Sequence, residues 1–163
     1  MRTLFFALLS FVCLVASGEV RYKDQDFSLA LDGDWVQLPL LFVEHVGFRS
    51  EALGLHVKIM GITERVRPGR TRLVASKLLE ETIRREIASA KPGVKVSITH
   101  QEVSDIEGGT AATYRGYDSS GRAFLTVEHI YPERSVMLFF EAPEANAQNL
   151  DAAAAEVLRG LFK

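Results

Sequence analysis

Residues 94–142 read VKVSITHQEVSDIEGGTAATYRGYDSSGRAFLTVEHIYPERSVMLFFEA, and this stretch decides the fold. Its first six residues alternate apolar and polar side chains, as a half-buried strand does. Further strands are expected at residues 110–117, 123–131 and 135–142, after short turns at 108–109, 118–121 and 132–134. Links this short join antiparallel neighbours, because a parallel connection needs a crossover of about a dozen residues or more. The stretch therefore predicts an antiparallel meander.

Two amphipathic helices are expected around this meander. Residues 70–90 place apolar side chains on one face, and the dipeptide Pro92-Gly93 ends the pattern. The last segment repeats apolar residues with helical spacing at Leu150, Ala154, Val157, Leu158 and Leu161. The run 136–140 is apolar on both faces, which predicts a central strand covered by helices on both sides.

The N-terminal half adds shorter strands, expected at residues 20–22, 27–31, 42–49 and 55–59. Trp35 follows a turn at residues 32–34 and is expected to pack in the core or against the turn rather than to bind a partner. The sequence contains neither an internal repeat nor a low-complexity linker. We therefore predict one α+β domain over residues 18–163, with a single antiparallel β-sheet packed by a central helix and a C-terminal helix.

The first residues have the pattern of a secretory signal peptide. One positive charge at Arg2 precedes the uncharged apolar run Leu4–Ala16, and small residues follow at Ala16-Ser17-Gly18. The run is shorter than the roughly 20 residues that a membrane-spanning helix needs. We expect a signal peptide over residues 1–17, cleaved after Ser17, and hence export: periplasmic in a Gram-negative cell, otherwise secreted. An uncleaved anchor is the alternative, and no stable membrane span is expected after cleavage.

Composition excludes several other classes of protein. Cys13 is the one cysteine of the 163 residues, and it lies inside the apolar run rather than after small residues, so lipidation is not expected. The domain that follows would have no thiol for a disulfide, a metal site or a nucleophile. With 19 Lys+Arg against 21 Asp+Glu, the chain is too balanced in charge to be a nucleic-acid-coating protein.

The order of strands and helices, read with one N-terminal motif, resembles the Mog1/PsbP-like family. The motif is Phe27-Ser28-Leu29-Ala30-Leu31-Asp32-Gly33-Asp34-Trp35, which resembles that family's opening strand and Gly-x-Trp-type turn. The segment from Phe48-Arg49-Ser50 to Leu55-His56-Val57-Lys58-Ile59 follows, and a central helix, a meander and a C-terminal helix complete the match. The resemblance implies a sheet packed between helices and a non-enzymatic binding or accessory role. No partner-binding residue of the family maps onto this chain.

Motifs for catalysis and for cofactors are not found in the sequence. It has no Gly-x-Ser-x-Gly nucleophile turn, and Gly108-Gly109 lacks the Gly-Lys-Ser/Thr of a phosphate loop. No short metal-ligand spacing links the histidines, which are His45, His56, His100 and His129. No enzyme activity, cofactor or metal is therefore expected. A hydrolase whose site is assembled from distant residues is an open alternative.

Four arginines fall within eight residues directly before the central helix, at Arg65, Arg67, Arg70 and Arg72. A helix N-terminus carries partial positive charge, so cations there cost a few tenths of a kcal/mol. Arginine concentrated at that end is typical of an anion-binding site, where guanidinium groups and backbone N–H groups bind phosphate or carboxylate. The alternative is a solvated loop whose arginines pair with Glu64 or with acids elsewhere.

Together these observations predict an exported, non-enzymatic binding protein. Its expected partner is another protein or a component of the cell envelope, and an anionic ligand could bind the arginine segment. A second hypothesis is a carrier of a small molecule or lipid in a pocket between sheet and helix, which an enclosed apolar cavity would favour.

Overall fold

The computed structural model of the chain describes residues 19–23, 27–39, 46–62, 65–67 and 69–161. The predicted signal peptide and residues 42–45 of one predicted strand lie outside these residues. None of the helices in the described ranges is both long and apolar enough to cross a membrane.

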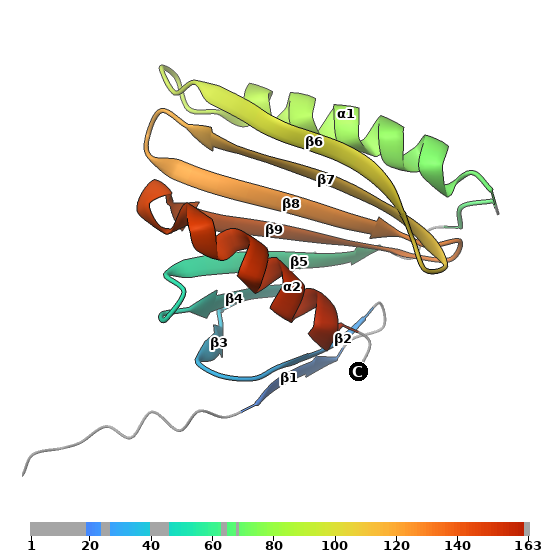
Figure 1. Cartoon of the computed structure of the whole chain (residues 1–163), viewed down its shortest axis with the longest axis horizontal. Coiled ribbons are helices and arrows are strands. Elements are labelled where there is room, and N and C mark those ends of the chain that lie inside the picture. Colours follow the sequence, from blue (N-terminus) through green and yellow to red (C-terminus); the bar gives the residue numbers. More distant parts are fainter. Residues whose placement is uncertain (1–18, 24–26, 40–45, 63–64, 68, 162–163) are drawn as a thin grey trace, which may run out of the picture.

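One seven-stranded sheet forms the centre of the molecule, and all neighbouring strands in it are antiparallel (Figure 1). Its strand order is β3-β4-β5-β9-β8-β7-β6. The strands are β3 (Trp35–Gln37), β4 (Val46–Ser50), β5 (Leu55–Ile62), β6 (Val96–Ile106), β7 (Gly109–Asp118), β8 (Arg122–Ile130) and β9 (Ser135–Pro143). The predicted meander is therefore confirmed, and the apolar strand β9 is the central strand of the sheet.

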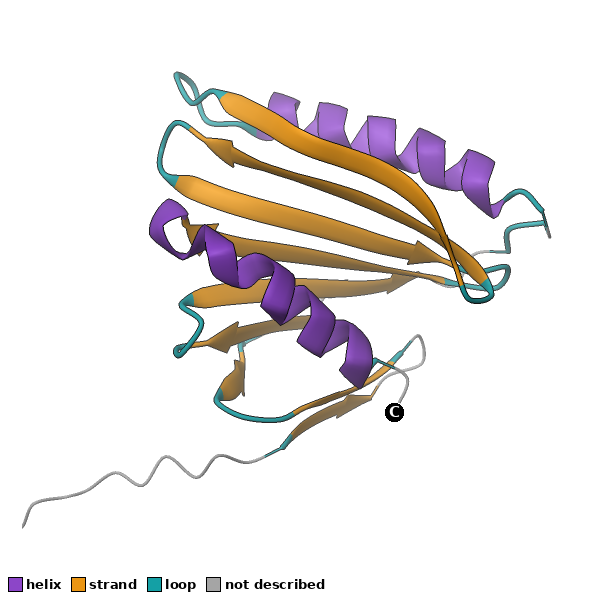
Figure 2. Cartoon of the chain, viewed as in Figure 1, coloured by secondary structure: helices purple, strands orange, loops and turns teal. Residues whose placement is uncertain are grey.

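The helices lie on opposite faces of this sheet (Figure 2). They are α1 (Thr71–Ser89) and α2 (Leu150–Gly160), with a short 3-10 helix, η1 (Glu144–Asn149), before α2. Two further strands, β1 (Val20–Lys23) and β2 (Ser28–Leu31), form a separate antiparallel hairpin beside α2. The fold class is α+β, as predicted, but the expected single sheet is in fact two over the described residues, because β1 and β2 pair with each other in a sheet of their own, which packs against α2 through β2.

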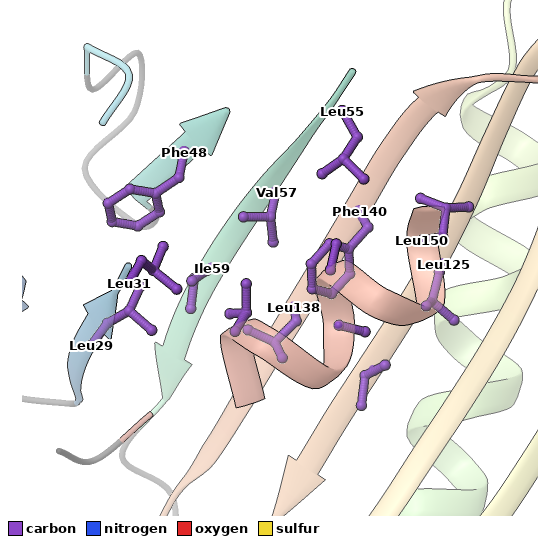
Figure 3. Close-up of a cluster of buried hydrophobic side chains, with 14 of the residues drawn as sticks. Leu29, Leu31, Phe48, Leu55, Val57, Ile59, Leu125, Leu138, Phe140 and Leu150 are labelled. Atoms are coloured by element: carbon purple, nitrogen blue, oxygen red, sulfur yellow. The ribbon is translucent and has the colours of Figure 1, made fainter. Parts of the chain in front are cut away.

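The larger hydrophobic core lies on the α2 face, where alternate residues of β4, β5, β8 and β9 meet the hairpin and α2. Figure 3 shows side chains of this core, among them Leu31, Phe48, Val57 and Phe140. The backbones of α2 and β2 approach so closely that a Cβ at Gly160 would stand 2.1 Å from a carbonyl oxygen of β2. Only glycine fits at that position.

Trp35 belongs to the same core, as predicted. Its side chain is 3% exposed, and its Nε1 donates to a carboxylate oxygen of Glu156 on α2 at 2.7 Å. This bond satisfies the polar end of the buried indole and connects the edge strand β3 to α2.

The smaller core lies under α1, whose contacts are mainly with β6, β7 and β8. Ala75 and Leu79 are the buried residues of this helix, and they pack near Tyr114 and Phe124. The prediction that helices cover the central strand on both sides is right for α2, whereas α1 lies over the neighbouring strands. Strand β6 also differs from the expected strand at 94–99: it runs to Ile106 through an irregularity between Ile98 and His100.

Candidate functional site

The four arginines singled out in the sequence lie at the N-terminal end of α1. Arg65 and Arg67 belong to the segment before the helix, Arg70 is its N-cap residue and Arg72 is in its first turn. Two backbone bonds hold the segment: Val66 N–H donates to the carbonyl of Pro132 at 2.8 Å, and Arg70 N–H donates to that of Arg67 at 3.0 Å. The arginines therefore project from an anchored backbone.

These arginines differ in their partners. Arg72 Nη1 lies 3.1 Å from Asp105 Oδ1 on β6, and both side chains are largely exposed. Arg65, Arg67 and Arg70 are exposed, and no residue in the described ranges forms an ion pair with them. The predicted pairing with an acid is thus seen for one of the four, and Glu64 lies outside the described residues.

A fifth arginine joins this end of the molecule. The bond from Val66 to Pro132 places the arginine segment against the turn between β8 and β9, which carries Arg134. The Arg134 guanidinium lies 5.8 Å from the centre of the Tyr131 ring. Arg134 was not predicted from the sequence, because the residues of a short turn do not show which distant segment that turn will contact. We call the set Arg65, Arg67, Arg70, Arg72 and Arg134 the basic surface.

The electrostatics of α1 add to the positive charge here. Its first turn contains no acidic residue, and no side chain caps its N-terminus among the described residues. Arginine, rather than the usual acid or hydroxyl, therefore stands where the helix already carries partial positive charge. The exposed acids at this end are Asp105, Glu107 and Glu133.

A second charged cluster, centred on Arg122 of β8, lies at the other end of α1. The Arg122 guanidinium donates to three carboxylates: Nε to Asp118 at 2.8 Å, Nη1 to Glu141 at 2.8 Å and Nη2 to Glu86 of α1 at 2.5 Å. These carboxylates are between 6% and 13% exposed, so each is largely removed from water, and all three share the same cation. We call these four residues the Arg122 cluster.

The pKa values in this cluster follow from its contacts. Burial by itself would raise the pKa of Asp118, but hydrogen bonds from Ser120 and Arg122 outweigh it and lower the pKa to about 2. Burial likewise opposes ionisation of Glu141, yet bonds from His56, Arg122 and Lys58 hold its pKa well below the ordinary value. Asp118 and Glu141 are therefore ionised at neutral pH.

A cavity of about 470 Å³ opens beside the Arg122 cluster, between the C-terminal end of α1 and the sheet. Its lining combines the charged side chains with Phe139 and Val94. The wall is polar and apolar in similar measure and the cavity is partly open, whereas the carrier hypothesis calls for an enclosed apolar space. Sequence reasoning missed this cluster because its members come from α1, β7, β8 and β9.

The histidines are dispersed in the part of the chain that the structure describes. His56 Nε2 lies 2.8 Å from Glu141, and His100 lies near Glu102 on β6, an edge strand of the sheet. Burial lowers the pKa of His129, whose Nδ1 is 3.4 Å from the Tyr131 hydroxyl. Over the described residues, no three potential ligands from His, Cys, Asp or Glu gather to hold a metal ion.

The layered arrangement is that of the Mog1/PsbP-like fold, so the resemblance read from the sequence is confirmed at the level of the fold. The solution structure of cyanobacterial PsbP (CyanoP) from Synechocystis matches with a TM-score of 0.67 at 12% identity, over 94% of this chain and 97% of that one. LpqN, described as involved in cell envelope biogenesis of Mycobacterium tuberculosis, matches with a TM-score of 0.50 at 14% identity, over 89% and 90%. No protein-family model and no curated protein sequence matches the chain.

Proposed function

We propose that this chain is an exported, non-enzymatic accessory protein that binds an acidic partner or an anionic ligand through the basic surface. The observation that carries the proposal is the exposure of Arg65, Arg67 and Arg70, which no described carboxylate pairs, on a backbone held by one hydrogen bond to the β8–β9 turn. Guanidinium groups bind carboxylate and phosphate with two parallel hydrogen bonds, so such a surface suits anions.

Export and an accessory role have separate support. The signal-peptide pattern of residues 1–17 favours export, and LpqN, one of the structural neighbours, is involved in cell envelope biogenesis. The largest charged cluster, around Arg122, has its carboxylates bonded to cations, which is the arrangement of a structural network. The intact mass of protein recovered from cells tests export: loss of residues 1–17 is expected, and a full-length mass would contradict it.

The binding proposal is tested by reversing two charges. Arg67→Glu with Arg70→Glu should abolish retention on a sulfonate resin at pH 7 and low salt, while circular dichroism shows an unchanged fold. The wild-type chain has a net charge of −2, so its own retention requires a local basic surface.

A matched control keeps the total charge change the same. Lys95→Glu with Arg159→Glu alters two exposed cations away from the basic surface, and its retention should equal that of the wild type. Equal losses in both double variants would show that net charge, and not this surface, governs binding. Unchanged retention after reversal at Arg67 and Arg70 would contradict the proposal directly.

The cavity beside the Arg122 cluster favours a second candidate function, the carriage of a small polar ligand. Its volume of about 470 Å³ would hold a small molecule, and its wall offers charged groups beside the Phe139 ring. Native mass spectrometry of protein recovered from its compartment would detect a bound molecule. Phe139→Trp, which fills part of the cavity, should remove that molecule. A bare protein mass in both samples would exclude this candidate.

A further inference from the structure

Helix α1 has apolar side chains on two opposite faces. Ala75 and Leu79 face the sheet and are buried, whereas Leu73 is 52% exposed and Ile87 is 51% exposed. These two are among four large apolar residues that are exposed in the described part of the chain; the others are Val36 and Tyr117. Since a helix covering a sheet needs one apolar stripe, the second pair calls for another explanation.

Leu73 and Ile87 lie on one narrow stripe with several cations. Helix α1 runs from Thr71 to Ser89, and at about 100° per residue its positions 73, 77, 80, 84 and 87 fall within an arc of roughly 80°. This arc, which contains Leu73, Lys77, Glu80, Arg84 and Ile87, lies opposite the buried side of α1. Two further cations flank it: Arg70 at the N-cap and Lys91 just beyond the C-cap. All seven residues are exposed, and we call them the outer stripe.

We propose that the outer stripe of α1 docks on a bilayer surface of anionic lipids, an inference that rests on and deepens the proposed binding function. Four cations stand against the single acid Glu80, which matches the negative charge of phosphate headgroups. Leu73 and Ile87, separated by about four helical turns, enter the headgroup layer side by side with the cations. The basic surface continues the stripe at its N-terminal end through Arg70.

Charge also argues against a second copy of the chain as the occupant. Two outer stripes facing each other would bring two sets of four cations together, each with one acid, and like charges on that scale repel. A small anion or an acidic polypeptide would be bound by the cations alone, and would leave two exposed apolar side chains unused. A bilayer surface uses both kinds of residue at once.

The experiment removes the apolar contacts and keeps every charge. Protein without residues 1–17 is floated with vesicles of phosphatidylglycerol and phosphatidylcholine, and with vesicles of phosphatidylcholine alone. The wild type should bind the first and not the second. Leu73→Ser with Ile87→Ser should weaken binding to the anionic vesicles about tenfold or more, because two apolar side chains no longer enter the headgroup layer. Val36→Ser, at an equally exposed residue of β3, should leave binding unchanged.

Retention on the sulfonate resin separates this inference from the proposed function. The serine double variant should be retained like the wild type, because its charges are intact. Equal binding of the serine variant and the wild type to anionic vesicles would overturn the lipid contact. Retention on the resin, or binding to polyglutamate, without vesicle binding would also overturn it, while an anionic protein partner would remain. Failure on resin and vesicles alike would reject both proposals.

Discussion

The arginines near the two ends of α1 differ in whether carboxylates pair with them. At the C-terminal end, Arg122 donates to three nearly buried carboxylates, and its cluster ties α1 to β7, β8 and β9. At the N-terminal end, Arg65, Arg67 and Arg70 are exposed and unpaired by any described acid. The same type of side chain thus links elements of the fold where acids surround it and is left exposed to solvent where they do not. Stability should therefore depend on the first region and binding on the second.

The largest expected effect comes from removing the shared cation. Arg122→Met should lower the free energy of unfolding by about 3 kcal/mol, because the nearly buried carboxylates of Glu86, Asp118 and Glu141 would lose the cation that they share. Urea denaturation measures this change.

Arg67→Met is the matched control for that measurement, and it should change the free energy of unfolding by less than about 0.5 kcal/mol because Arg67 is exposed. Similar effects of the two substitutions would show that the two ends of α1 do not differ as described.

Acid should weaken the Arg122 cluster selectively. The pKa of Asp118 is lowered from 3.8 to about 2, and that of Glu141 is also lowered, so their stabilisation is complete above their ordinary pKa values. The contribution of Asp118, on the order of 2 kcal/mol, is lost as pH falls from about 4 to 2, and that of Glu141 is lost progressively as pH falls below its ordinary pKa. Urea denaturation at several pH values should show a steep decline for the wild type and a shallower one for Arg122→Met. Parallel profiles would contradict this account.

Much of the fold follows from local signals in the sequence. Short turns around Gly108, Ser119 and Pro132 require antiparallel neighbours, and the apolar run of β9 predicts the central position that this strand takes. The pairing of β9 with β5 is different, since α1 and three strands separate the two in the sequence. No local pattern specifies such a pairing; the packing of whole layers decides it.

The two charged regions also differ in how much of each can be predicted from the sequence. Most of the basic surface can be recognised in the sequence because four of its arginines fall within eight residues, whereas Arg134 cannot. The Arg122 cluster was invisible because strand register creates it: β8 and β9 pair so that Phe124 stands opposite Glu141, and β5 brings His56 to the same carboxylate. Acids that look like solvated surface residues one by one become partners only after the sheet has formed.

The smallest expected effect on stability concerns Arg70 and has the opposite sign. Arg70→Glu replaces a cation by an anion at the start of α1, where the helix carries partial positive charge and has no acid in its first turn. The free energy of unfolding should rise by about 0.5 kcal/mol, while retention on the sulfonate resin falls. Arg85→Glu, an exposed position in the middle of the same helix, should give no such gain. If stability rises and binding falls, Arg70 contributes its positive charge to binding and lowers the stability of the fold. A loss of stability would instead mean that Arg70 makes a stabilising contact, and the contrast between the two ends of α1 would then fail at this residue.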